Sequence, residues 1–587
     1  MSRIVRVVSL SLLLVAGLGV RLALGGAADK PQSILDLQQF RRTASVEWAD
    51  AQGRRGSATL MEINPNINSW LLLILDWPGS LEPQSYHLEN TDPAGTHISL
   101  QASAGHGLRL SSGSRSADCV LWSEHDSVPL EEARRSGLPY APLCEGRLYL
   151  RNQVPGTYTH LEKVTNFLRD HVWGGDRVVN FVKDEFFRDA FAEKAGQAAP
   201  DARAASERAS ENEPHAAQLD PAVVGTTIVP EHLGLDLQGA QHDLPIGIWH
   251  TVNNAPGIYV SAIRPQDVAA SVGTGYRGRV ASLDTVEASA VDYLVAFDLA
   301  QFDLGYALGT DHPRLGWSGR ELPEMHDNRL PGPDGIVTAA PLVRTGMVSP
   351  ELVGRTAATF AGGFKREHAA FRFGELAHRN HGSHYGFMEQ GTVFSTLQPG
   401  LSTVYVLDDG SVGMKTWETS DNVLLPHVRH ARQNGVPLIE AASAEGPGVP
   451  GALVAQWGPG NWSGSEDKNL RTVRAGLCMQ STGTHRFLIF GYFSTATPSA
   501  MARVFQAYSC QYGMHLDMNA LEHTYMALYT RKDGRLLIQH LVEGMGEVDR
   551  KGGNQLAPRF LSFPDDRDFF YLMRRPTTPS ARDTTVP

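Results

Sequence analysis

Four polar residues near the C-terminal end of the chain could act together in proton transfer. Asp517, Asn519, Glu522 and His523 fall within seven positions of one another. A carboxylate and an imidazole at this spacing could share the roles of general acid and general base. The alternative is that Asp517 caps a turn and His523 lies on the surface. The residues alone leave both interpretations open.

A second group of titratable residues lies in the segment HRNHGSHYGF, which holds His378, His381 and His384 at intervals of three. Neither a helix nor a strand places all three on one tight metal-binding face. An irregular loop could gather two of them, with His485 or His515 completing a site. We predict that the protein has no cofactor and that none of these residues is a metal ligand. A divalent metal bound in this loop is the weaker alternative.

The residues before Asp517 predict the elements that position it. Thr497 can cap a helix that has Pro498 at its first position. Apolar residues then recur at the spacing of one buried helix face, namely Met501, Val504, Phe505 and Tyr508. This helix leads directly into the strand HLDM. Asp517 is therefore expected at the end of a buried strand, where α/β folds commonly place site residues.

Five short motifs follow one another over about 160 residues of the C-terminal half. They are AGGFK at 361–365, LDDGSVG at 407–413, ARQNGVPLI at 431–439, RTVRAGL at 471–477 and TPSAMARVFQAYSCQYGMHLDMN at 497–519. In this order they resemble the phosphodiester glycosidase family, typified by the enzyme that removes N-acetylglucosamine from a phosphodiester. The resemblance implies a mixed α/β fold and a hydrolase of glycosyl phosphodiesters.

Three departures from the family pattern bear on the activity. Ala361 stands where the family has Asn, Lys365 replaces the second Phe, and the family's GGGS after Asp517 is absent. Gly-rich turns let backbone N–H groups approach a phosphate closely, so their loss removes that device. The resemblance therefore bears on the fold more than on the chemistry.

The resemblance also implies contacts with substrate. Gly362, Gly363 and Lys365 belong to the first motif, while Arg432 and Arg474 belong to two later ones. The three cations are the implied contacts for a phosphate or uronate group. A surface ion pair is the alternative for each of them.

Three further residues are candidates for contact with a sugar. The family segment that follows the first motif borders the pocket, which implies that His384 and Tyr385 line it. Trp457 belongs to QWGPGNW, where two tryptophans flank a Gly-Pro-Gly turn. An exposed Trp face stacks on a sugar ring, and packing in the core is the alternative.

The four cysteines are expected to form two disulfides. No CxxC pair is present, so a zinc ribbon or a thioredoxin-like motif is excluded. Cys119 and Cys144 lie in one β-rich segment and would close a loop across it. The resemblance implies that the elements holding Cys478 and Cys510 pack together, which makes a second disulfide plausible.

The first residues predict export. Arg3 and Arg6 precede an apolar stretch at 7–20, and small residues follow it at 25–28. This pattern is typical of a secretory signal peptide cleaved after Ala28. We expect a periplasmic or extracellular protein without a membrane span, and an uncleaved signal anchor is the alternative.

Composition divides the rest of the chain and predicts an α+β protein. Short β-branched or aromatic runs predict strands at 45–48, 58–63, 70–76, 97–101, 108–110, 119–122 and 148–151, and later at 257–263, 293–297, 403–407, 453–456, 487–490, 514–518 and 536–540. The predicted organisation is a signal peptide (1–28), a β-rich module (31–155), a helical pair (156–195), a disordered linker (196–220), the phosphodiester-glycosidase-like domain (221–575) and a tail (576–587).

Charge and missing motifs exclude several function classes. The 587 residues include 52 Lys plus Arg against 63 Asp plus Glu, a net charge of −11, and no basic run is present. Nucleic acid is therefore an unfavourable partner. No P-loop, Rossmann, HExxH or GxSxG motif is present. The leading hypothesis is an exported hydrolase of a glycosyl phosphodiester or cell-envelope glycan, and the alternative is a non-catalytic glycan-binding or envelope structural protein.

Overall fold

The structure is a computed structural model, and it describes most of the chain beyond the predicted signal peptide. The described residues are 33–49, 52–101, 106–159, 162–163, 189–194, 197–198, 212–239, 243–276, 278–371, 374–382, 384–443, 446–456, 469–552 and 555–576. The predicted signal peptide, most of the predicted helical pair, 199–211 of the predicted linker and Trp457 lie outside them. No helix among the described residues combines the length and the apolar character that a membrane span requires.

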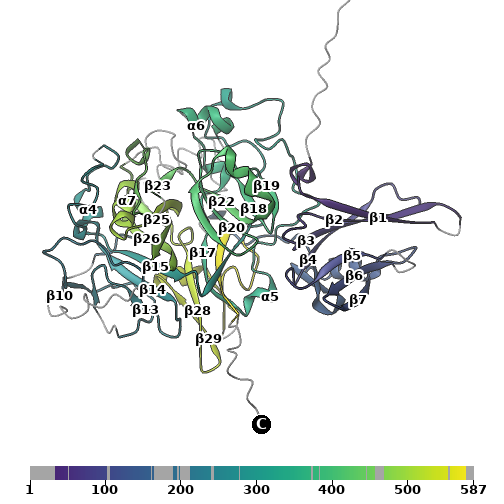
Figure 1. Cartoon of the computed structure of the whole chain (residues 1–587), viewed down its shortest axis with the longest axis horizontal. Helices are drawn as coiled ribbons and strands as arrows, with labels where there is room; N and C mark the ends of the chain where they lie inside the picture. Colours follow the sequence, from purple (N-terminus) through teal and green to yellow (C-terminus); the bar gives the residue numbers. More distant parts are fainter. Residues whose placement is uncertain are drawn as a thin grey trace, which may run out of the picture.

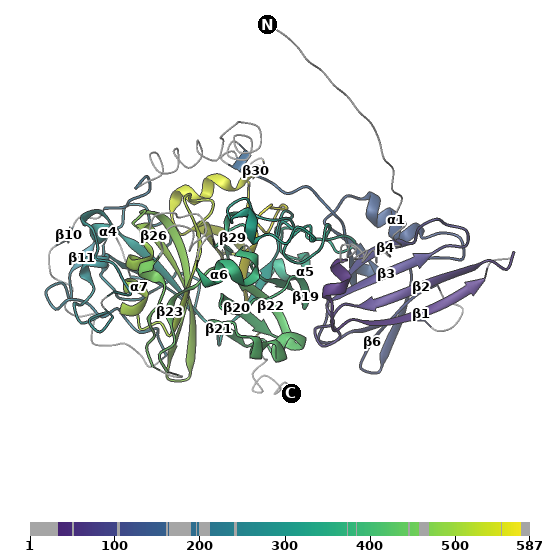
Figure 2. The same ribbon diagram turned by 90° about the horizontal axis from the view of Figure 1, so that it is seen from above.

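An N-terminal β module forms one end of the elongated molecule (Figures 1 and 2). Its six-stranded sheet has the order β1-β2-β3-β4-β9-β8, and a three-stranded sheet, β5-β6-β7, lies beside it. The strands are β1 (Arg42–Ala49), β2 (Arg55–Glu62), β3 (Trp70–Asp76), β4 (Gln84–Asn90), β5 (His97–Leu100), β6 (Gly107–Ser112), β7 (Arg115–Val120), β8 (Tyr140–Leu143) and β9 (Leu148–Arg151). Helix α1 (Val128–Arg135) packs Leu130 and Ala133 into the same core.

An eight-stranded sheet, β13-β14-β15-β26-β25-β27-β23-β24, carries the strand that ends near Asp517. Its strands are β13 (His250–Thr251), β14 (Ile258–Ile263), β15 (Asp292–Asp298), β23 (Pro437–Glu440), β24 (Val449–Pro450), β25 (Thr472–Thr482), β26 (His485–Ala496) and β27 (Tyr512–Met518). Helix α7 (Pro498–Ala507) packs on it. As predicted, the Thr497 side chain accepts a hydrogen bond from the Ala500 N–H, and the predicted apolar face is buried.

Two five-stranded sheets complete the core. One has the order β16-β32-β17-β28-β29 and the other β19-β18-β22-β20-β21. Their strands are β16 (Phe302–Ala307), β17 (Thr356–Ala361), β18 (Phe387–Glu389), β19 (Thr392–Ser395), β20 (Ser402–Leu407), β21 (Val412–Thr416), β22 (Val428–Gln433), β28 (Met526–Lys532), β29 (Arg535–His540) and β32 (Phe569–Arg574).

The remaining described elements are small. Two short sheets have the orders β10-β11-β12 and β30-β31. Their strands, with the other α-helices, are β10 (Gln197–Ala198), β11 (Thr227–Ile228), β12 (Leu244–Pro245), β30 (Arg550–Gly552), β31 (Gln555–Ala557), α4 (Thr285–Ser289), α5 (Pro350–Val353) and α6 (Glu375–His378).

The described fold is mixed but strand-rich, with few helices. Every pair of strands with a described register is antiparallel, including β25–β27 and β23–β27. The expectation that Asp517 lies at the end of a strand is confirmed. The reason given for it was wrong, because the site crevice of α/β folds forms at the ends of parallel strands and the strands beside Asp517 are antiparallel. Residues before β32, rather than a parallel crossover, meet Asp517.

Most predicted strands are present, and one is wrong. Residues Val454–Gln456 form a 3-10 helix, in which the Gln456 N–H donates to the Leu453 carbonyl at 3.0 Å. A short apolar run does not separate the two conformations by its period. Both predicted disulfides, Cys119–Cys144 and Cys478–Cys510, are present.

The N-terminal module packs closely against the rest of the chain. Tyr140 donates its hydroxyl to the Met347 carbonyl at 2.9 Å, and Gln38 exchanges hydrogen bonds with the backbone of Val393. Arg151, which is 2% exposed, pairs with Glu89 and lies 3.7 Å from Glu389. Trp70 and Ile63 join the same hydrophobic core as the C-terminal sheets. The boundary after β9 is therefore a packed interface.

Candidate functional site

Asp517 lies beside a guanidinium that precedes another strand. It is the penultimate residue of β27, and its carboxylate pairs with Arg567, two residues before β32. One carboxylate oxygen also accepts the Met518 N–H at 2.8 Å. Burial raises the pKa of Asp517 to about 6, although Arg567 works in the opposite direction. A carboxyl group with this pKa exchanges its proton near neutral pH.

Arg567 joins three segments of the chain. Besides Asp517, it pairs with Glu162, and its Nη2 lies 2.9 Å from Nε2 of His523. Burial disfavours both charges, but Arg567 outweighs it and holds the pKa of Glu162 well below its usual range. Glu162 and Asp517 likewise raise the pKa of Arg567 against the effect of burial. The guanidinium is therefore shared between two carboxylates.

The ring of His523 is fixed at both nitrogens. Its Nδ1 lies 2.8 Å from the Met518 carbonyl oxygen and its Nε2 faces the Arg567 guanidinium. A carbonyl only accepts and a guanidinium only donates, so Nδ1 carries the proton and Nε2 accepts. His523 is thus positioned as a neutral base.

The turn between Asp517 and His523 keeps a conformation that favours glycine. Asn519 has φ 80°, which Asn tolerates better than other residues with a side chain. Glu522, at the end of this turn, accepts a hydrogen bond from the Thr159 hydroxyl at 2.7 Å. Burial raises the pKa of Glu522. Asn519 thus occupies a backbone conformation in which glycine is the usual residue.

Two further ion pairs lie in the same region. Lys365 Nζ lies 2.6 Å from Asp566, and Arg432 Nε lies 2.9 Å from Asp568. Burial raises the pKa of Asp566 to about 7, with Lys365 opposing it. Arg432 outweighs burial at Asp568 and lowers the pKa of that carboxyl. The two neighbouring carboxyls therefore differ in acidity.

Gly362 and Gly363 allow these pairs to approach the backbone. A Cβ at Gly362 would lie 2.4 Å from the Asp568 carboxylate, and one at Gly363 would lie 3.0 Å from Arg432 and Asn434. The Gly362 N–H also donates to the Asp568 carbonyl at 2.8 Å. The two glycines therefore provide space for ionic side chains.

We call this group the central cluster. It consists of Glu162, Lys365, Arg432, Asp517, His523, Asp566, Arg567 and Asp568. Five segments supply these residues, and the side chains of Asp517 and Arg567 are only 8% and 6% exposed. The arrangement combines a carboxyl that titrates near neutral pH, a neutral imidazole and three cations, which is what acid–base cleavage beside an anion requires.

Several of the predicted site residues lie elsewhere. Arg474 is fully buried and donates to the carbonyls of Ala496 and Leu470, and burial lowers its pKa to about 9. His384 contacts the Thr396 carbonyl, and both His384 and Tyr385 are buried. Trp457 lies outside the described residues.

The histidines of the predicted loop are separated. His378 is exposed, His381 packs edge-on against Trp317, and His384 is buried. Within the described part of the chain, no group of three or more His, Cys, Asp and Glu side chains is placed to hold a metal ion.

Sequence reasoning missed half of the central cluster. Asp566, Arg567 and Asp568 belong to FPDDRDFFYL, where a run of four charges enters a strongly apolar strand. Charges at the edge of a buried strand are expensive unless they are paired, and this was the available signal. Glu162 carried no such signal, because its neighbours form a predicted helix.

Comparisons with known proteins add little to this geometry. No family model and no curated protein matches the sequence. Several solved structures match this chain, among them the following two. One is the zebrafish N-acetylglucosamine-1-phosphodiester alpha-N-acetylglucosaminidase catalytic domain auto-inhibited by its pro-peptide, with 8% identity over 64% of this chain and 99% of that chain and a TM-score of 0.27. The other is a hypothetical protein from Synechocystis, with 10% identity over 91% of this chain and 97% of that chain and a TM-score of 0.25. Likeness at this level carries no argument about the chain.

Proposed function

We propose that the chain is an exported hydrolase that cleaves a glycosyl phosphodiester or a related cell-envelope glycan at the central cluster. The observation that carries this proposal is the meeting of Asp517 and His523 around Arg567. One group titrates near pH 6, the second is a neutral base, and the third is a fixed cation. The motif order of the sequence supports the same reaction class.

The roles follow from the chemistry of each group. Asp517, in its protonated form, donates its proton to the phosphate oxygen that leaves the anomeric carbon. Arg567 turns from His523 toward the substrate phosphate, and the freed Nε2 of His523 then accepts a proton from the attacking water, whose oxygen forms the new bond to that carbon. Arg567 and Lys365 balance the charge of the departing phosphate. Arg432 positions Asp568 and acts outside the bond-breaking step.

Access to this site requires Thr157–Thr159 and Glu162 to move away from the central cluster. Thr157 pairs with Asp565, Thr159 donates to Glu522, and Glu162 occupies the guanidinium of Arg567. A substrate phosphate would replace the Glu162 carboxylate on Arg567. The described conformation is therefore the closed form of the proposed site.

The closure also favours a second candidate function. Each cation of the central cluster already has a carboxylate partner, which is the pattern of a structural ion-pair network. A non-catalytic glycan-binding or envelope structural protein would keep the network for stability alone.

One assay separates the two candidates. The chain without its first 28 residues is tested on an aryl glycosyl phosphodiester, together with Asp517→Asn, His523→Gln and a surface control, Asp327→Asn. The hydrolase proposal expects a loss of roughly 100- to 10,000-fold in kcat for the first two variants and none for the control. Glu162→Gln should raise kcat/KM by weakening the closed form.

Two results would reject the hydrolase. One is an absence of turnover in both the starting protein and Glu162→Gln. The other is turnover that Asp517→Asn leaves unchanged. Either result would favour the structural candidate.

A further inference from the structure

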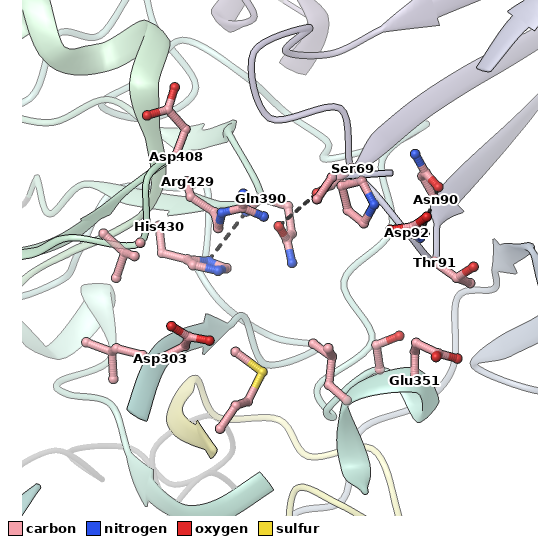
Figure 3. A pocket seen from close by; sticks show the side chains of 18 of the residues that line it. Ser69, Asn90, Thr91, Asp92, Asp303, Glu351, Gln390, Asp408, Arg429 and His430 are labelled. Carbon is pink, nitrogen blue, oxygen red and sulfur yellow. Dashed lines mark hydrogen bonds between the residues drawn. The ribbon is translucent and has the colours of Figure 1, made fainter. Parts of the chain in front are cut away.

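A cavity of about 450 Å³ lies between the N-terminal module and the C-terminal sheets, away from the central cluster. One wall comes from the end of β4 and the loop after it, including Asn90 and Asp92. The β20–β21 turn and β22 lie across the cavity from them, and α5 borders it on a further side (Figure 3). Its volume falls within the roughly 300–1,000 Å³ of small-molecule sites.

The side of the cavity formed by β22 and the β18–β19 turn presents side-chain hydrogen-bond donors that have no acceptor among the described residues. The side chain of Arg429 is half-buried and forms no hydrogen bond or close ion pair with any residue that the structure describes, although the carboxylates of Asp408 and Asp303 act on it at longer range. Gln390 uses its side-chain oxygen to accept from Ser69 at 3.0 Å, which leaves its amide N–H₂ without an acceptor in the described chain. Figure 3 shows Arg429, Gln390 and His430 on the same side of the cavity.

His430 adds a third donor. Its Nδ1 faces the backbone N–H of Gln390 at 3.5 Å, so the proton of the neutral ring belongs on Nε2. Burial, reinforced by Arg429, holds the pKa of His430 well below its usual range. Burial also lowers the pKa of Arg429. A poorly solvated guanidinium next to two unused N–H groups is unfavourable unless a ligand supplies oxygen atoms.

Carboxylates also line the cavity. Asp92, Glu351 and Asp409 are exposed and lie at its mouth, whereas Asp303 and Asp408 are half-buried and raise the pKa of Arg429 against the effect of burial. Together these carboxylates would repel a ligand that carries several negative charges, but they accept hydrogen bonds from hydroxyl groups. The ligand therefore has one anionic group and several hydroxyls.

We propose that this cavity binds a saccharide residue bearing a single carboxylate, of the hexuronate type. The carboxylate lies against Arg429, because a guanidinium matches a carboxylate with two parallel hydrogen bonds. Gln390 and His430 donate to the remaining oxygens, and the sugar hydroxyls face the acidic mouth. This site is independent of the proposed hydrolase reaction, and both modules are needed to form it.

Calorimetric titration of the chain without its first 28 residues tests this site. The probes are D-glucuronate, D-glucose, acetate and inorganic phosphate. We expect saturable binding of glucuronate in the millimolar range or tighter and much weaker binding of the other three. Equal binding of acetate or phosphate would reduce the site to a simple anion site and overturn the proposal. Equal binding of glucose, or no binding of glucuronate, would overturn it too.

Three variants locate the binding. Arg429→Gln should weaken glucuronate binding by about tenfold or more, the usual effect of losing a charged hydrogen bond. Arg486→Gln removes the same charge from an exposed position outside the cavity and should leave binding unchanged. Ala94→Trp fills the exposed mouth without touching the donors and should block binding. Unchanged affinity in either cavity variant would overturn the assignment.

Discussion

Arginine has opposite surroundings in the central cluster and in the cavity between the N-terminal module and the C-terminal sheets. In the central cluster, Arg567 is nearly buried and lies between the carboxylates of Asp517 and Glu162. In the cavity, the side chain of Arg429 forms no ion pair within 4 Å among the described residues, and Asp408 and Asp303 act on it only at longer range. Burial of an arginine therefore does not by itself identify a ligand site. The number of donors left without an acceptor is more informative.

The difference also bears on energetics. Removing one partner from a buried ion pair leaves the other charge unpaired in a poorly solvated place, which is costly. Removing a charge that has no partner costs little, because no interaction is lost. Replacing an arginine should therefore lower the free energy of unfolding more in the central cluster than in the cavity, even without a ligand.

The largest effect is expected from Arg567→Met. This change leaves Asp517 and Glu162 buried without their shared cation, and it should lower the free energy of unfolding by about 3–5 kcal/mol. Urea unfolding followed by tryptophan fluorescence measures it. Arg55→Met is the matched control, because this exposed arginine lies 3.7 Å from Glu47 and such pairs contribute about 0–1 kcal/mol. Equal losses in both variants would contradict the description of the central cluster as tightly paired.

A pH effect of on the order of 4 kcal/mol is expected next, from Asp566. Burial raises its pKa from 3.8 to about 7, so the folded state holds the proton more tightly than the unfolded state. This group therefore costs stability progressively as the pH rises from about 4 to about 7. Asp566→Asn should flatten that part of the stability curve.

The slope against pH, rather than stability at one pH, is the readout for Asp566. Asp76→Asn, on an exposed strand end, serves as the control and should keep the slope of the starting protein. An unchanged slope in Asp566→Asn would show that Asp566 is ionised throughout this range.

A smaller effect is expected at the interface that forms one side of the cavity. The hydroxyl of Tyr140 lies 2.7 Å from the Thr345 hydroxyl and donates to the Met347 carbonyl. Tyr140→Phe keeps the ring and should cost about 1–2 kcal/mol, because it removes the buried hydrogen bonds of the hydroxyl to Thr345 and Met347. Tyr276→Phe, at a partly exposed ring, is the control. No change in Tyr140→Phe would show that the two modules are held together by other contacts.

The sequence predicted local elements better than the assembly of the site. The helix after Thr497 has a cap, a proline and a four-residue apolar face, so local rules were sufficient to place it. Asp517 and His523 are close in sequence, and the structure brings both to Arg567. The two disulfides joined elements that neighbour one another, which is why their pairing was within reach.

Long-range pairing explains what sequence reasoning missed. Arg567 and Asp517 are 50 residues apart, and Glu162 is 405 residues from Arg567. No periodicity connects such positions, because antiparallel sheet order is not encoded in any local window. Arg474 was predicted to contact substrate, but it lies outside the central cluster. Its guanidinium donates instead to the backbone carbonyls of Ala496 and Leu470, and the residues around it in sequence do not indicate these partners.

The smallest effect on stability is expected from Arg429→Gln, and it completes the comparison with Arg567. Because Arg429 has no described partner to leave behind, the change should alter the free energy of unfolding by less than about 0.5 kcal/mol. Addition of glucuronate should then raise the unfolding midpoint of the starting protein, since a ligand that binds only the folded state stabilises it in proportion to its occupancy. The variant should show a much smaller rise at the same glucuronate concentration. A large loss of stability without ligand would mean that Arg429 is a structural residue, and the contrast between a paired and an unpaired arginine would no longer hold.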